Sequence, residues 1–531
     1  MRIKFHWHNY RYLPYEESLA TQELAVMSGN EPTKQRDGLE IETMKNWKDF
    51  AMRTTYFRAA VSPSGECVVP TQAVFEASAN GGVKKKGGSY EPPKLNRQST
   101  RYSAHGIHEY RGKFNPQIVR AIGNILNVKP GQCVLDPFCG SGTTLLEAAH
   151  IGWNAVGVEI NPLGVEISNA KIASVHIPAR KLETNSEALI ERLSRKLNNI
   201  PFDVRFSKES VKTVGGTRWA DTLPNLEYLR AWFSESVLVQ ISAILREVNE
   251  VADPRARLIF RVILSDILRG VSLQDVADLR IRRTKTPAEN APAIPAFLKA
   301  LSCQVRTILK ARRFLRKVRT RQAAILGDIR ECASVARKFN ESQLFDAAIT
   351  SPPYVAALPY IDTQRLSLAA LGLIASGDLR ATERALIGNR EITNTERKNL
   401  VQAITQNSDN LPAVCISLVL KMNAALDRAT DGFRRQNMPA LTYQYCRDMG
   451  RMFSQTHSLL KPHAPFALVV GINKTSLGGK EFIINTPELL ASLAEQNGFT
   501  TDEVIELDTY HRFDIHQANS IRSEVLLILR A

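Results

Sequence analysis

A short stretch of the chain places a strand, a glycine turn, a helix and a second strand in immediate succession. The apolar residues from Cys133 predict a strand that ends at Asp136, and a turn containing Gly140 and Gly142 follows it. The pattern next predicts a helix that begins near Thr143 and then a strand that ends in an acid. Glycines let the backbone come close to a ligand, and this order of elements is typical of α/β nucleoside-cofactor sites.

The acid at the end of the second predicted strand is Glu159. A carboxylate at this place can accept hydrogen bonds from both hydroxyls of a ribose. The alternative is an α/β crossover that merely happens to carry glycines. The complete run from Asp136 to Thr144, with Glu159 at the spacing of the cofactor fold, favours the cofactor site.

Composition limits the partners and the compartment. The chain has 531 residues and a formal net charge of +16 at pH 7, which favours a polyanionic partner, nucleic acid first and an anionic membrane surface second. No apolar run approaches the ~20 residues that span a bilayer, and the first residues lack the apolar region of a secretory signal. The seven cysteines include no Cys-x-x-Cys pair. We therefore predict a cytoplasmic protein without disulfides or a metal site.

A second motif follows a buried strand far downstream. Residues 345–350 predict this strand, and Ser351-Pro-Pro-Tyr354 comes directly after it. Two adjacent prolines stiffen the backbone and have no N–H, so this segment predicts a rigid edge of carbonyl oxygens. Such an edge can accept hydrogen bonds from an exocyclic amino group while Tyr354 stacks on the base. A plain loop or a proline-rich ligand is the alternative, and the position behind a buried strand disfavours it.

The two motifs together resemble those of the DNA amino-methyltransferases, the N4-cytosine and N6-adenine family. In that family Asp-Pro-Phe-x-Gly-Ser-Gly-Thr-Thr binds S-adenosylmethionine, and (Asp/Asn/Ser)-Pro-Pro-(Tyr/Phe) is the catalytic motif. The resemblance covers roughly residues 100–175 and 321–531. It implies a class I methyltransferase fold, which is a Rossmann-like, doubly wound α/β sheet with an antiparallel C-terminal hairpin.

The resemblance also implies roles for individual residues. The residues expected around S-adenosylmethionine are Asp136, Phe138, Gly140, Gly142, Thr143, Glu159 and Asp328. Among them, Glu159 would hold the ribose, and Asp328, at the end of a short predicted strand, would hold the adenine edge. The residues expected to hold the target base are Ser351, Pro352, Pro353 and Tyr354. Residues 105–116 either belong to the scaffold or close over the methionine end of the cofactor.

The rest of the chain divides around these motifs. Residues 1–98 have no predicted role and end in a basic glycine and lysine linker, and residues 99–175 form the first half of the catalytic domain. Residues 176–320 predict a basic, mostly helical insertion, where one subclass of the family keeps its target-recognition region. Residues 321–531 form the second half of the catalytic domain, with a helical insertion over about 374–440.

Two basic clusters in the 176–320 insertion are candidates for contacts with phosphates, because each neutralised phosphate releases condensed counterions. One cluster follows Asp278, and the other belongs to an amphipathic helix predicted over Arg306–Arg321. The candidates are Arg280, Arg282, Arg283, Lys310, Arg312, Arg313 and Arg316. A solvated helix face is the alternative for both clusters.

Three functions agree with these motifs. We favour methyl transfer from S-adenosylmethionine to an exocyclic amine of a DNA base that is flipped out of the duplex. Serine before Pro-Pro favours cytosine N4 over adenine N6, and a restriction or defence protein would be a partner. The alternatives are an RNA guanine-N2 methyltransferase and a catalytically idle nucleic-acid-binding subunit with the same fold. A carbon-5 cytosine methyltransferase is disfavoured because the Pro-Cys dipeptide of its nucleophile is absent.

Overall fold

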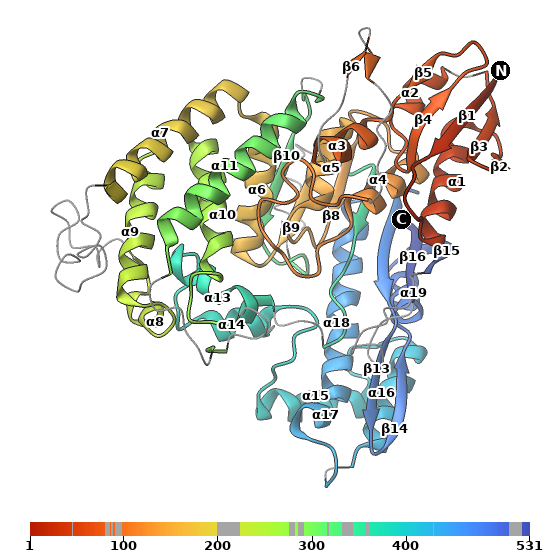
Figure 1. Ribbon diagram of the computed structural model, residues 1–531. Coiled ribbons are helices and arrows are strands. Elements are labelled where there is room, and N and C mark those ends of the chain that lie inside the picture. Colours follow the sequence, from red (N-terminus) through yellow and green to blue (C-terminus); the bar gives the residue numbers. More distant parts are fainter. Residues whose placement is uncertain are drawn as a thin grey trace.

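A seven-stranded sheet lies at the centre of the computed structural model, in the order β10-β9-β8-β11-β12-β16-β15 (Figure 1). In that order the strands span Gln322–Leu326, Asn154–Glu159, Cys133–Asp136, Ala347–Thr350, Pro465–Gly471, Ser523–Arg530 and Thr500–Asp508. The residues that the structure describes are 1–44, 46–79, 98–198, 223–275, 282–284, 291–315, 318–331, 344–356, 360–427, 429–507 and 524–531, with the backbone alone of 85–86, 89–90, 508 and 523.

The directions of the strands confirm the predicted fold class. The five strands from β10 to β12 are parallel, whereas β16 pairs antiparallel with both β12 and β15. This is a doubly wound α/β sheet that closes with an antiparallel C-terminal pair. Side chains along the central strands alternate between two hydrophobic cores: Leu135 and Val156 belong to one, and Val134 and Ala155 to the other. Both faces of the sheet are therefore buried, as parallel sheets require.

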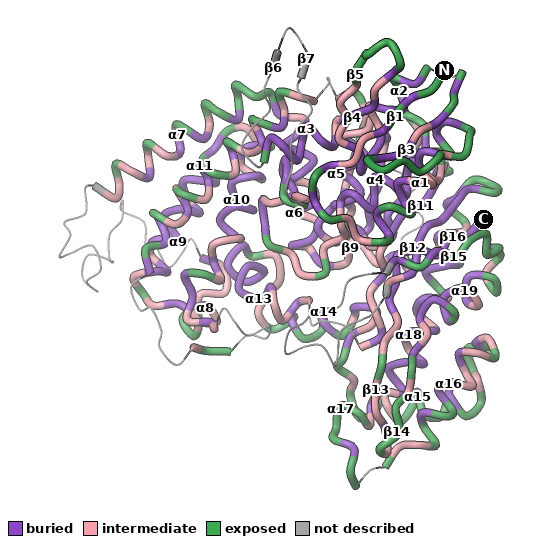
Figure 2. The backbone as a smooth tube through the Cα atoms, turned by 45° about the vertical axis from the view of Figure 1, so that its right-hand side comes forward, coloured by how far each residue is buried: buried purple, intermediate pink, exposed green. Residues whose placement is uncertain are grey.

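Helices cover both faces of this sheet, and its central strands are buried (Figure 2). Helices α4 (Pro116–Ile125) and α5 (Thr143–Ile151) pack into the core that contains Val134. Helices α18 (Met438–His457) and α19 (Thr486–Gln496) pack into the core on the other face. The sheet and these four helices leave the carboxyl ends of the parallel strands along one edge.

A second sheet lies beside the central one and is built from the N-terminal residues (Figure 1). It is antiparallel, in the order β2-β3-β1-β4-β5. The elements of this region are β1 Arg2–Trp7, α1 Pro14–Ser28, β2 Thr33–Gln35, β3 Gly38–Glu42, α2 Trp47–Ala51, β4 Phe57–Val61, β5 Cys67–Val68, α3 Thr71–Ala79, β6 Lys85–Lys86 and β7 Ser89–Tyr90. Buried Glu23 in α1 accepts hydrogen bonds from Thr55 N (2.8 Å) and from Asn124 Nδ2 in α4 (3.0 Å). The N-terminal sheet therefore shares a core with the central sheet.

A group of helices lies on the β10 side of the sheet (Figure 1). They are α6 Pro162–His176, α7 Ala179–Asn198, α8 Leu226–Arg230, α9 Glu235–Asn249, α10 Pro254–Leu268 and α11 Ala293–Arg312. The helix predicted over Arg306–Arg321 was wrong in its bounds. Helix α11 begins earlier and ends at Arg312, because the chain must turn into β10. The Arg321 carbonyl already accepts a hydrogen bond from Ala155 N at 3.0 Å, beside that strand.

The remaining elements extend below the carboxyl edge of the sheet in Figure 1. They are α13 Tyr360–Ala370, α14 Leu379–Ala385, α15 Asn394–Gln406, α16 Ala413–Ala425, α17 Phe433–Gln436, β13 Asn473–Leu477 and β14 Lys480–Ile484. Strands β13 and β14 form an antiparallel pair. Over the described part of the chain, none of the helices has both the length and the apolar character needed to cross a bilayer.

Candidate cofactor and target-base site

The glycine turn connects β8 to α5 at the carboxyl edge of the sheet. Gly140 (φ +50°) and Gly142 (φ +72°) both adopt the left-handed conformation that favours glycine. A Cβ added to Gly142 would lie 2.7 Å from the Cβ of Ser168 in α6. Helix α5 begins at Thr143, as predicted, and Gly142 is its N-cap residue. Position 142 therefore requires glycine for its conformation and also for its packing.

Helix α6 holds the turn in place through two side chains. Ser168 Oγ donates to the Gly140 carbonyl at 2.9 Å, and Lys171 Nζ donates to the Ser141 carbonyl at 2.6 Å. Lys171 is fully buried, and burial holds the pKa of its ammonium group well below the usual range. The turn is therefore fixed by contacts inside the protein before any ligand binds.

Two buried acids flank the turn. Glu159 accepts hydrogen bonds from Gly140 N (2.9 Å) and Asn161 N (2.8 Å). Asp136 accepts one from the Thr350 hydroxyl at 2.7 Å. Burial raises the pKa of Glu159 to about 7 and the pKa of Asp136 to about 6, although these hydrogen bonds act in the opposite direction. Both carboxyl groups therefore change charge close to neutral pH.

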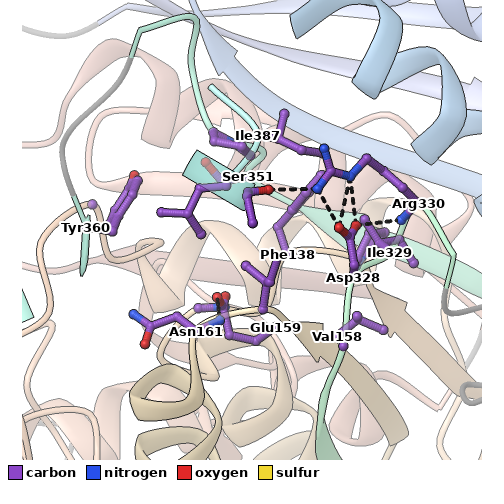
Figure 3. Close-up of a pocket in the computed structure, with 18 of the residues that line it drawn as sticks. Phe138, Val158, Glu159, Asn161, Asp328, Ile329, Arg330, Ser351, Tyr360 and Ile387 are labelled. Carbon is purple, nitrogen blue, oxygen red and sulfur yellow. Dashed lines mark hydrogen bonds and ion pairs between the residues drawn. The ribbon is translucent and has the colours of Figure 1, made fainter. Parts of the chain in front are cut away.

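One pocket at this edge receives residues from both motifs (Figure 3). It contains about 710 Å³ of space, part of it open to solvent. The predicted site residues that line it are Phe138, Gly140, Glu159, Asp328, Ser351 and Pro353. The predicted residues that do not line it are Asp136, Gly142, Thr143, Pro352 and Tyr354.

Two tyrosines close one side of the pocket. Tyr110 comes from the segment 105–116, and Tyr360 is the first residue of α13. Their rings lie 6.3 Å apart, centroid to centroid, and are nearly parallel. In Figure 3, Tyr360 lies across the pocket from Arg330, with Phe138 between them. The segment 105–116, for which a scaffold role was the alternative, therefore forms part of the pocket wall.

The other side of the pocket is an ion pair between Asp328 and Arg330. Arg330 Nε donates to Asp328 Oδ1 and Oδ2 at 2.9 and 3.0 Å, its Nη2 also donates to Oδ2, and its backbone N–H donates to Oδ1 at 3.0 Å. A carboxylate has about four lone-pair sites. Because these four contacts occupy them, Asp328 could hold an adenine edge only if the ion pair opened. That role stays a prediction.

The Ser351-Pro-Pro-Tyr354 loop follows β11, as predicted, and is fixed by two side-chain hydrogen bonds. Ser351 Oγ donates to the Val469 carbonyl at 3.2 Å. The Tyr354 hydroxyl donates to Glu524 Oε1 at 3.2 Å. Burial, and next the charge of Glu524, raise the pKa of the Tyr354 hydroxyl, so the phenol stays neutral. The orientation of the Tyr354 ring therefore depends on β16.

The first basic cluster lies on the pocket side of the helical region. Arg280 is outside the described residues, whereas Arg282 and Arg283 are exposed. Arg283 donates from Nε to the Ala231 carbonyl at 2.9 Å, directly after α8. Helix α8 contacts α13, whose first residue lines the pocket. Arg283 therefore lies against the end of α8, whose N-cap residue Asn225 bonds to the C-terminal end of α13 at Ala369 (3.1 Å).

The second basic cluster lies at the other edge of the sheet. Arg316 is outside the described residues, and Lys310 and Arg313 are exposed. Arg312 is half-buried and donates to the Ser174 carbonyl at 3.1 Å, near the C-terminal end of α6. Helix α6 begins beside the pocket and has 15 residues, so its ends are about 22 Å apart at 1.5 Å per residue. This cluster is therefore remote from the pocket.

Arg330, Lys171 and Tyr360 contribute to the site or its support but were not predicted to do so. Arg330 and Lys171 belong to no motif pattern, and each acts on a segment distant in sequence. Tyr360 follows Ser-Pro-Pro-Tyr closely, so an aromatic residue near a base-binding loop was a usable signal. Glu524 in β16 supports the loop because it accepts the hydrogen bond of the Tyr354 hydroxyl.

One group of side chains in the described part of the chain has the spacing of a metal site: His105, Glu147 and His150. Glu147 Oε2, however, already accepts a hydrogen bond from Arg120 Nε at 3.0 Å. His105 and Tyr102 both reach Glu147 Oε1 at 2.8 Å, and all of these groups are buried. The guanidinium supplies the positive charge that a metal would bring, so the cluster is a buried ion pair.

Comparison with protein families supports the reading of the pocket. Residues 31–170 match the N6/N4 methyltransferase family model, which is described as DNA methylase. The match includes the glycine turn and Glu159, and it begins inside the N-terminal sheet. Residues 31–98, to which no role was assigned, are therefore part of what this family has in common.

Individual relatives are distant. The type II methyltransferase M.MvaI of Kocuria varians is 24% identical over 48% of this chain and 54% of its own length, so the chain spans about half of that relative. M.AvaI of Nostoc sp. is 22% identical over 76% of this chain and 80% of its own length. A tRNA (guanine(10)-N2)-dimethyltransferase of Methanothermobacter thermautotrophicus is 34% identical over 18% of this chain and 28% of its own length. Over residues 31–170 the chain is therefore similar to the N6/N4 DNA methylases, and over longer stretches it is distantly similar to type II methyltransferases.

Proposed function

We propose that this protein transfers a methyl group from S-adenosylmethionine to an exocyclic amino group of a DNA base. The observation that carries the proposal is the shared pocket: Gly140 and Glu159 of the turn and Ser351 and Pro353 of the loop line it together. Direct transfer needs the reacting atoms about 3–3.5 Å apart, so both sites must open into one space. The match of residues 31–170 to the DNA methylase model and the net charge of +16 support DNA as the substrate.

The residues of the pocket fit S-adenosylmethionine. Two backbone N–H groups orient the Glu159 carboxylate, and its remaining lone pairs can accept ribose hydroxyls. Phe138 and Tyr110 offer apolar surface. When bound, the cofactor supplies an electrophilic methyl group.

The Ser351-Pro-Pro-Tyr354 loop would hold the target amine. An exocyclic amine is a poor nucleophile because its lone pair is conjugated with the ring. Acceptors on the loop favour a pyramidal nitrogen and stabilise the positive charge that develops there. Ser351 Oγ donates its hydrogen to the Val469 carbonyl. Its lone pairs can therefore accept a hydrogen bond from the target amine. Pro352 offers only a carbonyl, and Tyr354 stacks on the base.

The Ser351-Pro-Pro-Tyr354 loop also supports a choice of target base. Serine before Pro-Pro supports cytosine N4 over adenine N6, and the base must leave the duplex to reach the pocket. Because M.MvaI and M.AvaI are named type II methyltransferases, a restriction enzyme or another defence protein that reads the same DNA site is the proposed partner.

RNA is the second candidate substrate, since a tRNA (guanine(10)-N2)-dimethyltransferase is 34% identical over 94 residues. That match covers only 18% of this chain and 28% of the relative, so it gives weak support for a common substrate. A catalytically idle nucleic-acid-binding subunit is the third. The intact pocket, with both motifs in its lining, disfavours that third function.

One experiment separates these functions. The protein is incubated with methyl-labelled S-adenosylmethionine and either unmethylated genomic DNA or total RNA, and the label in each polymer is counted. Label in DNA is the expected result. Label in RNA alone would overturn the proposal in favour of the second candidate, and cofactor binding without label in either polymer would favour the third.

A further inference from the structure

The segment 385–390 runs between the two halves of the pocket. Its first three residues line the pocket: Ala385 ends α14, and Leu386 and Ile387 follow it. Asn389 is buried and fixes the turn that follows: its Nδ2 donates to the Leu386 carbonyl at 3.0 Å, and its Oδ1 accepts from Glu391 N at 2.9 Å. Residues 385–390 therefore form an ordered wall of the pocket, here called the wall.

The wall is bonded to the cofactor side through Arg330. The guanidinium donates to the Ala385 carbonyl at 2.7 Å while it holds Asp328 (Figure 3). It also donates to the buried carboxylate of Asp448 in α18 at 2.8 Å. Charge-assisted hydrogen bonds of this kind are roughly twice as strong as neutral ones. Any movement of Asp328 is therefore transmitted to the start of the wall.

The other end of the wall is bonded to the target-base loop. Gly388 has φ +73°, and a Cβ there would lie 2.3 Å from the Tyr354 carbonyl oxygen. Two residues further on, Arg390 Nε donates to the Ala356 carbonyl at 2.7 Å. Ala356 itself has φ +50°, which an alanine adopts only when its surroundings enforce it. The wall therefore sets the path of the chain at Tyr354 and directly after it.

We propose that residues 385–390 couple the two halves of the site, with Arg330 and Arg390 as positioning residues. Occupancy of the cofactor half orders the Tyr354 loop through this wall, so cofactor and DNA each tighten the binding of the other. Such coupling is reciprocal and typically lies between about 5- and 150-fold. The inference rests on the proposed function, because it names how that pocket joins its two ligands.

Gly388→Ala tests the coupling, with Gly377→Ala as the matched control. Gly377 lies in the preceding connection, between α13 and α14 and outside the pocket lining, and a Cβ there would meet nothing within 4 Å. The affinity for S-adenosylhomocysteine is measured by calorimetry, with and without saturating fragments of unmethylated genomic DNA. In the native protein and the control, DNA should tighten that affinity about tenfold. In Gly388→Ala the affinity without DNA should stay within about twofold of native, the tightening by DNA should vanish, and kcat should fall roughly 10- to 100-fold.

Arg390 gives a second arm whose substitution creates no steric clash. Arg390→Ala should lower kcat while leaving the KM for S-adenosylmethionine unchanged, and Arg390→Lys should restore part of the loss. If Gly388→Ala and Arg390→Ala both kept the native coupling and the native kcat, the inference about residues 385–390 would be wrong. The proposed function would still stand. An inactive native protein would overturn the proposed function, and this inference with it.

Discussion

The two halves of the pocket are held in shape by different means. On the cofactor side, backbone conformation and close packing within one continuous stretch fix the turn, as the contacts of Gly142 with Ser168 show. On the target side, the loop depends on groups far away in sequence: Tyr354 on Glu524, and the chain after it on Arg390. The cofactor half is thus organised locally, whereas the target half depends on tertiary contacts. In the absence of DNA, changes in the target half should therefore leave cofactor binding nearly unchanged.

The largest effect is expected from Gly142→Val. A branched side chain at φ +72°, with Ser168 atoms 2.7 Å from the Cβ position, must displace α6 or the turn. Strain and overpacking together predict a loss of cofactor affinity of about 100-fold or more. Gly131→Ala is the control, because Gly131 also has positive φ but no atom near its Cβ position. Calorimetry with S-adenosylhomocysteine measures the effect. Native affinity in Gly142→Val would show that the glycine turn is not part of the cofactor site.

Tyr354→Ala should cause the next largest effect, confined to the target half. Loss of base stacking is worth about 1–3 kcal/mol, which predicts a fall in turnover of roughly 10- to 100-fold. Cofactor affinity should stay within about twofold. Tyr354→Phe keeps the ring and removes only the hydrogen bond to Glu524, so it should lose a few-fold. If Tyr354→Ala turned over normally, the loop would not stack on the base.

Glu159→Gln should weaken cofactor binding about tenfold, because a neutral amide replaces the acceptor of the ribose hydroxyls. The same change should stabilise the cofactor-free protein at pH 8. Burial raises the pKa of Glu159 from 4.5 to about 7, so its contribution to the free energy of unfolding is present below pH 4.5 and is lost as the pH rises through 7. Melting temperatures from pH 4.5 to 8 should fall less steeply in the variant. If the melting temperatures of the native protein and the variant changed in parallel with pH, Glu159 would not titrate as a buried carboxyl group.

The smallest effect is expected from charge on the surface, where the two basic clusters can be compared. Arg282→Ala with Arg283→Ala, on the pocket side, should weaken DNA binding a few-fold and reduce the salt slope of log K by about 1.8 for two phosphates. Lys310→Ala with Arg313→Ala, at the remote edge, should change the slope by less. The pairs are compared by DNA binding across salt concentrations, and a larger change from the second pair would place the DNA on the other side of the molecule.

The cofactor half could be predicted from the sequence because its determinants are neighbours in the chain. Asp136, the glycines and Glu159 belong to one strand–turn–helix–strand unit, and the structure keeps every element of it. For the target half, the sequence revealed the Ser-Pro-Pro-Tyr motif but not its supports. Gly388 and Glu524 meet Tyr354 only because of how the chain returns to the sheet, which no local pattern encodes.

The same reasoning explains the wrong bounds of one helix and the absence of any structural prediction for the N-terminal region. The helix expected over 306–321 extended an apolar periodicity past Arg312, where pairing of the chain with the sheet takes precedence over helix propensity. The N-terminal residues had no recognisable motif, yet they form a sheet that shares a core with the central one. Tertiary packing decided both cases, and a single sequence does not display it.

The central claim is that the Ser351-Pro-Pro-Tyr354 loop presents an exocyclic amine to the cofactor half. Its most direct test is the identity of the product: unmethylated DNA is treated with the protein and S-adenosylmethionine, digested to nucleosides and analysed by mass spectrometry against standards. We expect N4-methylcytosine. N6-methyladenine would agree with the same mechanism and would change only the target base. Methylation at carbon 5 of cytosine would contradict the account, because that chemistry has no use for an acceptor edge around an amine.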